Sequence, residues 1–232
     1  MVSSVKAVLF DLVGTLIYVK DSVGTIYANS AMQYGLVSDP NALNNCFYKI
    51  SERKPKPSGG NVEEKRWWRE VVQETFEKSG INIGENFQAL FEDIFREFAT
   101  KSSWGVYLDV IPTLRNLASK KIKSALISNF DNRLPELLKD LKLSKYFDSL
   151  AYSGKVGVSK PDAKIFRFAL NELNILPEEA ICVGDSLEMD YYPSQALNIN
   201  SLIINRDKHN LKGIKTISNL TQIIEFIDKQ IV

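Results

Sequence analysis

The sequence is poor in the residues that build disulfide scaffolds, histidine metal sites and catalytic triads. Its two cysteines, Cys46 and Cys182, lie far apart and among apolar neighbours. This setting favours reduced, buried thiols over a disulfide framework, so we expect a cytoplasmic protein. The only histidine, His209, sits in the polar run NRDKHN and gives no metal or triad signature.

An excess of charge of one sign is also missing. Lysine and arginine total 29 against 28 aspartate and glutamate residues, a net charge of +1. No overall field attracts nucleic acid or an anionic membrane, so we expect neither as a partner. The apolar stretch MVSSVKAVLFDLVGTL is broken by Lys6, lacks a signal-peptide layout and is too short to cross a bilayer. A small-molecule substrate is the expected partner, and the oligomeric state stays open.

Short apolar runs of β-prone residues alternate with helical patterns along much of the chain. Such runs are typical of buried parallel strands, and their alternation with helices predicts an α/β fold with a doubly wound parallel sheet. The predicted strands are 5–10, 122–128, 180–183 and 201–204, and the predicted helices are 134–143, 163–173, 189–197 and 220–231.

Between residues 18 and 105 the pattern is helical, with no β-like run. Aromatic residues such as Trp67, Phe76 and Phe91 recur there at helical spacing, which predicts a separate hydrophobic core. We therefore predict an all-helical cap domain over 18–105, inserted after the first strand. The α/β core then consists of 1–17 and 106–232.

Polar residues fall where the predicted strands end, and in a parallel sheet ligands bind beyond those ends. Each residue also has a structural explanation, because an aspartate can cap a helix, a serine can satisfy a loop amide and a lysine can be solvated. The joint pattern indicates a site. Its members are Asp11 after the first strand, Ser128 and Asn129 after the second, Lys160 before a helix, and Asp185 and Asp190 after the third.

Four motifs in order, FDLVGTL, ISN, SKPD and VGDSLEMD, resemble those of the haloacid dehalogenase superfamily of hydrolases. The resemblance spans nearly the whole chain, and four motifs at four strand or loop ends make a chance match improbable. A nucleotide-binding P-loop is excluded because no GxxxxGK[ST] occurs. More narrowly, RWW at 66–68, SNFDNRL at 128–134 and Val13 are similar to the eukaryotic haloacid dehalogenase-like hydrolase domain-containing protein three group and to archaeal glyceraldehyde 3-phosphate phosphatases.

The resemblance implies a role for each motif in catalysis. Asp11 is the nucleophile that attacks phosphorus or carbon, and Thr15 belongs to the sharp turn beneath it. Ser128 and the amide of Asn129 hold phosphoryl oxygens, while Lys160 balances charge on the nucleophile and on the transferring group.

The same resemblance implies a bound Mg²⁺. Its ligands are Asp11, the backbone carbonyl of Val13 and Asp185, and Asp190 orients that shell directly or through water. Hard oxygen ligands of this kind fit Mg²⁺ better than zinc.

Val13 departs from the family pattern. In family phosphatases this position usually carries a second aspartate, the general acid that protonates the leaving alcohol. General acid catalysis is typically worth ~10²- to 10⁴-fold, so we expect a slow phosphatase or one limited to good leaving groups unless the cap supplies a donor. The candidate donors are Tyr18, Lys20, Lys56 and Arg69.

Two alternatives to a Mg²⁺-dependent phosphatase of small metabolites stay open. Family 2-haloacid dehalogenases also lack the second aspartate and work without metal, but Asp185 stands where their serine would be. Without a cation it would repel Asp11, which favours the phosphatase. The other alternative is a metabolite-binding protein with little turnover.

Overall fold

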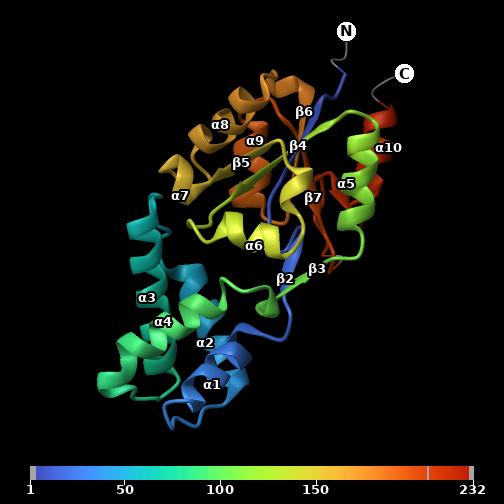
Figure 1. Cartoon of the computed structure of the whole chain (residues 1–232). Coiled ribbons are helices and arrows are strands. Elements are labelled where there is room, and N and C mark those ends of the chain that lie inside the picture. Colours follow the sequence, from blue (N-terminus) through green and yellow to red (C-terminus); the bar gives the residue numbers. More distant parts are fainter. Residues whose placement is uncertain (1–3, 208, 230–232) are drawn as a thin grey trace.

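The structure, a computed structural model, describes residues 4–207 and 209–229 (Figure 1). Its central sheet has six parallel strands in the order β5-β4-β1-β6-β7-β8. The predicted doubly wound α/β sheet is therefore confirmed. The strands are β1 Ala7–Phe10, β4 Lys123–Ser128, β5 Ser149–Tyr152, β6 Ala180–Gly184, β7 Asn200–Ile204 and β8 Thr216–Ile217.

The long strands are almost entirely buried because helices cover both faces of the sheet. In β1, Val8 and Phe10 join one apolar layer while Ala7 and Leu9 join the other, as the two-residue period of a strand requires. The first layer includes α5 (Val110–Ser119), α6 (Leu134–Asp140) and α10 (Gln222–Lys229), and the second is covered by α8 (Ala163–Leu173). In Figure 1, α5 and α10 lie on one side of the strands and α8 on the other.

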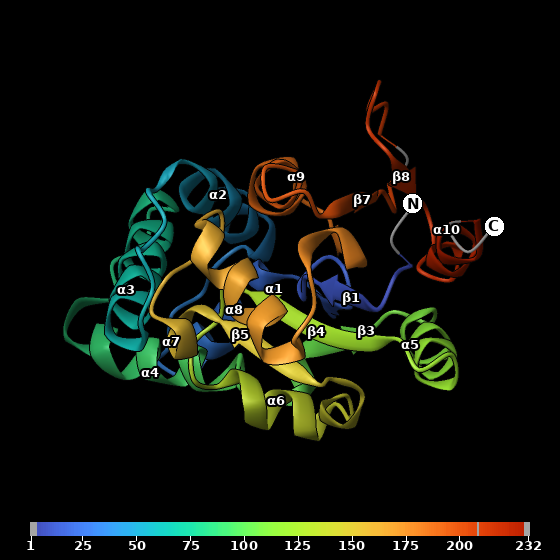
Figure 2. The ribbon, with the colours of Figure 1, turned by 90° about the horizontal axis from the view of Figure 1, so that it is seen from above.

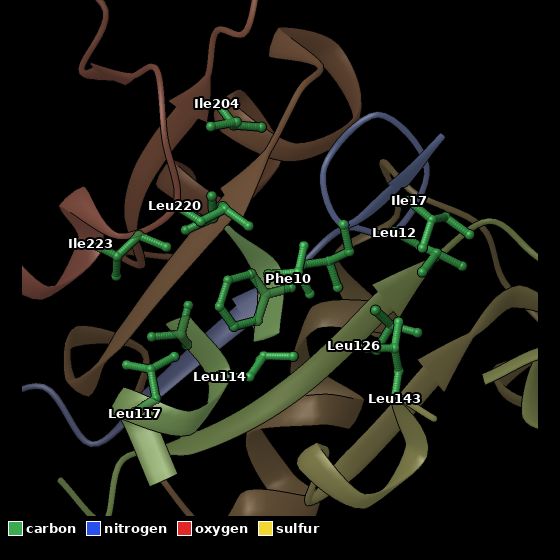
Figure 3. Packing of buried hydrophobic residues seen from close by; sticks show 14 of the residues in the cluster. Phe10, Leu12, Ile17, Leu114, Leu117, Leu126, Leu143, Ile204, Leu220 and Ile223 are labelled. Atoms are coloured by element: carbon green, nitrogen blue, oxygen red, sulfur yellow. The ribbon is translucent and has the colours of Figure 1, made fainter. Parts of the chain in front are cut away.

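Phe10 lies in the middle of the first layer. Figure 3 shows its ring among Leu114, Leu117 and Leu126, side chains that come from α5 and β4. Phe10 has no exposed surface. Truncating such a phenylalanine typically costs about 3–5 kcal/mol, so this packing holds β1, and with it Asp11, at a defined depth in the sheet.

The helical segment forms its own packed unit, which we call the cap. It consists of α1 (Val23–Met32), α2 (Pro40–Arg53), α3 (Asn61–Lys78) and α4 (Phe87–Glu97), packed around a cluster that includes Tyr27, Phe76 and Phe91. Ser22 caps α1 by accepting a hydrogen bond from the amide of Thr25. In Figure 2, α3 and α4 lie at the opposite end of the molecule from α5 and α10. Four helices thus lie in the segment where the sequence predicts the cap.

The structure corrects the prediction at the edges of the cap. Strands β2 (Ile17–Val19) and β3 (Trp104–Val106) pair antiparallel where the chain enters and leaves the helical segment. The statement that 18–105 contains no strand was thus wrong at both ends, because three-residue strands are too short to show alternation. The boundaries at 17/18 and 105/106 fall inside this pair, and the division into domains remains a prediction.

Other elements differ in length or type. The predicted helix 189–197 is a π-helical turn, Leu187–Tyr191, followed by the short α9 (Tyr192–Gln195), which contains Pro193 and therefore one backbone donor fewer. Helix 134–143 ends at Asp140, and helix 220–231 is observed as α10, with 230 and 231 outside the described residues. Strands β5 and β8 were not predicted; they have only four and two residues.

Both cysteines are free thiols, as expected, although Cys182 is buried and Cys46 only half-buried. His209 is exposed, with 73% of its side-chain surface accessible. No helix in the described part of the chain is long and apolar enough to span a bilayer.

Candidate active site

The carboxyl ends of β1, β4 and β6 meet at one pocket of about 260 Å³, which we call the catalytic pocket. Parallel strands bring these ends to one edge of the sheet, so residues far apart in sequence become neighbours. The pocket is closed from the other side by residues of the cap. Seven of the eight predicted site residues line it: Asp11, Val13, Ser128, Asn129, Lys160, Asp185 and Asp190.

An ion-paired triad lies at the floor of the pocket. The ammonium of Lys160 is 2.6 Å from Oδ1 of Asp11 and 2.7 Å from Oδ1 of Asp190. Burial alone would lower the pKa of Lys160, but the two carboxylates together raise it above its usual value, so the side chain stays charged. The second oxygen of Asp11, Oδ2, is buried and has no hydrogen-bond partner among the described residues. It is therefore available for a substrate or a cation.

A third carboxylate, Asp185, completes an acidic cluster. One oxygen each from Asp11, Asp185 and Asp190 lies within 4.8 Å of the other two. Asp185 borders the open pocket yet is largely surrounded by protein; this desolvation, followed by the charges of Asp11 and Asp190, raises its pKa to about 7. Burial also raises the pKa of Asp190, to about 6. The three carboxylates carry more negative charge than the single ammonium balances.

The cluster fits a small, hard divalent cation. Mg²⁺ takes oxygen ligands at about 2.1 Å, so opposite ligands of its octahedron lie about 4.2 Å apart, a separation within the 4.8 Å limit that the three carboxylate oxygens meet. Each of the three residues offers one carboxylate oxygen to such an ion. Asp190 already bonds Lys160 and accepts from the amide of Ser186 at 3.2 Å, which suits contact with the cation through water.

Two glycines make room for these acids. Gly14 has a positive φ of 88°, and a Cβ there would lie 2.0 Å from Oδ2 of Asp185. A Cβ at Gly184 would lie 2.2 Å from the carboxyl group of Asp190. Only glycine allows the two carboxylates to pack directly against the backbone at these positions.

The side chain of Asn129 positions Lys160. Its Nδ2 donates to the carbonyl of Lys160 at 3.0 Å, and its Oδ1 accepts from the Lys160 amide at 2.7 Å. The sequence assigned the amide of Asn129 to the phosphoryl group. The structure adds a second task for this residue, which is to attach the SKPD loop to the end of β4.

Thr15 is the predicted site residue that is not among those lining the catalytic pocket. Its side chain is fully buried, and its Oγ1 has no hydrogen-bond partner in the described part of the chain. Its carbonyl accepts from the guanidinium of Arg206 at 2.7 Å, and Arg206 also pairs with Asp109 at 3.0 Å. The structure places Thr15 in the turn that follows Asp11, so its contribution to catalysis stays a prediction.

Four residues were predicted as candidates for the proton donor that is missing at Val13, and one of them lines the catalytic pocket. Lys56 does so; its Nζ donates to the carbonyl of Ser51 at 2.7 Å and lies 4.5 Å from the centre of the Trp67 ring. Burial lowers its pKa. Tyr18, Lys20 and Arg69 are not among the described residues of the pocket wall.

Glu64, on α3, is a pocket residue that the sequence reasoning missed. It is 3% exposed and accepts hydrogen bonds from Oγ of Ser153 at 2.7 Å and Oγ of Ser159 at 3.3 Å, both in the core. Burial raises its pKa, against the effect of these bonds. The sequence feature that could have revealed Glu64 is its helical spacing: it stands three residues before Trp67, on the buried face of the helix.

Backbone contacts hold the cap against the core beside Glu64. The amide of Gly60 donates to the carbonyl of Ser153 at 3.1 Å, and the amide of Ser159 donates to the carbonyl of Ser58 at 3.0 Å. Gly59 permits this approach, since a Cβ there would lie 2.4 Å from Cα of Val158. Figure 1 shows α3 reaching toward α7 (Ser153–Val156) at this junction. The cap therefore contacts the core directly at one side of the catalytic pocket.

The fold combines a parallel α/β sheet with a helical insert behind the first strand. Its site has an aspartate after β1, a buried lysine and paired acids after β6. These features define a class of capped hydrolases with a Rossmann-like core. The chain belongs to the haloacid dehalogenase-like hydrolase family, whose model matches residues 5–193. It is 31% identical over 206 residues to haloacid dehalogenase-like hydrolase domain-containing protein 3 of Xenopus laevis, an alignment that covers 87% of this chain and 84% of the relative. The family that the motifs resemble is thus confirmed.

Two solved structures share the fold at low sequence identity. A HAD phosphatase from Thermococcus onnurineus superposes with a TM-score of 0.69 at 23% identity, over 96% of this chain and 97% of the other. A 2-haloacid dehalogenase from Pseudomonas syringae superposes with a TM-score of 0.65 at 21% identity, over 97% and 99%. Because a phosphatase and a dehalogenase both match, the fold does not choose between the two reactions.

Proposed function

We propose that the protein is a Mg²⁺-dependent phosphatase of small phosphorylated metabolites that works through an aspartyl-phosphate intermediate. One observation carries the proposal: three carboxylates, Asp11, Asp185 and Asp190, converge on a site where Lys160 is the buried cation. A divalent cation balances the remaining charge. A metal-free dehalogenase would leave Asp185 facing the nucleophile without compensation, which weakens that nucleophile.

In this proposal Asp11 attacks the phosphorus. Lys160 holds Oδ1, which leaves Oδ2 free to form a bond to phosphorus while the bond to the leaving oxygen breaks. The leaving group departs with the electron pair. Water then attacks the phosphorus of the aspartyl phosphate, and inorganic phosphate and the carboxylate of Asp11 are regenerated.

The other residues of the pocket bind and orient. Ser128 and the backbone amide of Asn129 stand at the end of β4, where they can hold phosphoryl oxygens. Asp11, the carbonyl of Val13 and Asp185 would hold Mg²⁺, with Asp190 behind them; when bound, the ion supplies positive charge to the phosphoryl oxygens. Cap residues such as Trp67 and Trp68 line the pocket opposite Asp11 and would limit the size of the substrate.

A dehalogenase is the second candidate, and Val13 favours it. This side chain lines the catalytic pocket where an acid would serve a phosphatase, and a departing halide needs no proton. The third candidate is a metabolite-binding protein that keeps this fold but has little turnover.

Hydrolysis of p-nitrophenyl phosphate and of L-2-chloropropionate, each with excess EDTA and with millimolar Mg²⁺, separates these functions. Phosphate release only with Mg²⁺ is the expected result. Halide release that EDTA does not affect would replace the phosphatase with the dehalogenase. Turnover of neither compound would favour the binding protein.

A further inference from the structure

A second cavity of about 260 Å³ lies beside the catalytic pocket, between the cap and the core, and we call it the apolar chamber. Its wall is almost entirely hydrophobic and largely aromatic. It shares Val13, Phe47, Trp68 and Asn129 with the catalytic pocket, so the two spaces adjoin. The remaining wall includes Tyr27, Val72, Phe91, Phe98, Trp104 and Phe130.

The guanidinium and the amide side chain in this wall are already engaged, which leaves the hydroxyl groups of Tyr27 and Tyr48 among its other polar groups. The guanidinium of Arg133 pairs with Asp131 at 2.7 Å, donates to the carbonyl of Phe95 at 2.5 Å and stacks 3.5 Å from the centre of the Phe95 ring. The amide of Asn129 bonds the backbone of Lys160. A sugar hydroxyl placed in the chamber would give up its hydrogen bonds to water with little replacement, whereas an apolar group would gain by burial.

Val13 stands at the junction of the two spaces. It lines both and is 40% exposed, so its methyl groups face whatever extends from the phosphoryl position at Asp11 into the apolar chamber. The leaving oxygen next to Val13 receives no proton from this position. A phenol ionises near pKa ~10, whereas water, like an alkyl alcohol, does so near ~16. A phenolate can therefore leave unassisted where an alkoxide cannot.

The size of the apolar chamber also suits a ring. An apolar cavity of roughly 150 Å³ is enough to bind benzene, so about 260 Å³ accommodates one or two fused rings. Aromatic walls offer such a ring stacked and edge-to-face contacts.

We propose that the substrate is a phosphate monoester of a phenol-type alcohol, with its phosphoryl group at Asp11 and its aromatic ring in the apolar chamber. The inference rests on the proposed phosphatase function. In the first step the bond from Asp11 to phosphorus forms as the bond from phosphorus to the aryl oxygen breaks. The phenolate leaves with the electron pair and takes a proton from solvent.

Steady-state kinetics with Mg²⁺ on three compounds tests the proposal. 1-Naphthyl phosphate has both the ring and the good leaving group, acetyl phosphate has a good leaving group without a ring, and glycerol 3-phosphate has neither. We expect kcat/KM for naphthyl phosphate to exceed that for glycerol 3-phosphate by about 10²-fold or more, the range that a missing general acid predicts.

Variants that fill the apolar chamber test whether the substrate ring binds there, because they should impair only substrates that carry a ring. Val72→Phe adds a ring to the wall from α3, and we expect it to lower kcat/KM for naphthyl phosphate by about tenfold or more while acetyl phosphate changes by less than about twofold. Val62→Phe, on the same helix but 74% exposed, is the matched control and should change neither. If Val72→Phe fails to fold, Val19→Phe fills the chamber from the half-buried β2.

These measurements test the aryl substrate and the phosphatase activity separately. Similar kcat/KM values for naphthyl and glycerol phosphates, or equal losses on naphthyl and acetyl phosphates in a folded filled variant, would overturn the aryl substrate and leave the phosphatase standing. No turnover of any of the three compounds would overturn the phosphatase itself.

Discussion

The side-chain amide of Asn129 binds the backbone of Lys160 on both sides, through a hydrogen bond of 3.0 Å to its carbonyl and one of 2.7 Å from its amide. Lys160 in turn holds Asp11 through its ammonium at 2.6 Å. An asparagine at the end of β4 thus holds the loop of the lysine that pairs with Asp11, the proposed nucleophile, at the end of β1. Packing alone would not set this alignment, because the loop before α8 has no ladder of strand hydrogen bonds to hold it.

Asn129→Ala should therefore lower activity through Lys160. We expect kcat to fall about 10- to 100-fold, as for other partners that orient a catalytic group, and the free energy of unfolding to fall by about 1–3 kcal/mol from the unmade bonds. Phosphatase kinetics and thermal unfolding measure the two effects. Asn132→Ala, an exposed neighbour on the same loop, is the control. Unchanged kcat in the Asn129 variant would mean that the ion pairs alone position the lysine.

Asp11→Asn should abolish turnover without unfolding the protein. The amide is nearly isosteric and can still accept from Lys160, but it is a poor nucleophile. We expect a loss of roughly 10⁴-fold or more in kcat, as when other covalent nucleophiles are removed. Acid-quenched wild-type enzyme should retain covalent phosphate, and the variant should not. Activity close to that of wild type would remove Asp11 from the role of nucleophile.

Asp185→Asn should raise the Mg²⁺ concentration required for half-maximal activity by about tenfold or more, because one charged ligand is lost. The measurement is a metal titration of activity together with metal binding by calorimetry. Glu188→Gln is the matched control, since this exposed carboxylate follows three residues later and lies outside the acidic cluster. An identical titration in Asp185→Asn and wild type would contradict the proposed metal site.

Glu64→Gln should become more stable relative to wild type as the pH rises. The pKa of Glu64 is raised in the folded protein, mainly by burial, with a smaller rise from Asp131 and with Ser153, Ser159 and Lys56 acting against the shift. The unfolded chain therefore loses its proton first, and wild type loses stability above the ordinary value of 4.5.

Melting temperatures of both proteins between about pH 4.5 and 8 measure this difference, since 4.5 is near the carboxyl group's unperturbed pKa. Below that range the difference between the two proteins should no longer change with pH, because the carboxyl group is then protonated in both states. Glu63→Gln, next to it and half-exposed, should show a much flatter difference. A constant gap between Glu64→Gln and wild type would contradict the raised pKa.

Much of the core could be predicted because parallel strands buried on both faces appear as continuous apolar runs. Val5–Phe10 and Ile122–Ser128 have this pattern, and β1 and β4 form within them. β2 and β3 escaped prediction because three residues carry too little pattern, and their pairing depends on the cap bringing residues 17 and 106 together. The π-helical turn after β6 was likewise not predicted, since hydrophobic spacing does not reveal local contacts such as the Ser186 cap and the packing of Asp190 against Gly184.

The sequence by itself determined which chemical groups stand at the ends of the strands: a carboxylate after β1, an asparagine after β4 and two acids after β6. Only the tertiary structure decided how these groups act on one another. Lys160 meets Asp11 across 149 positions and Glu64 meets Ser153 across 89. Charge balance, pKa and the shape of a cavity depend on distance and burial in space, and the closure of the cap on the core sets both.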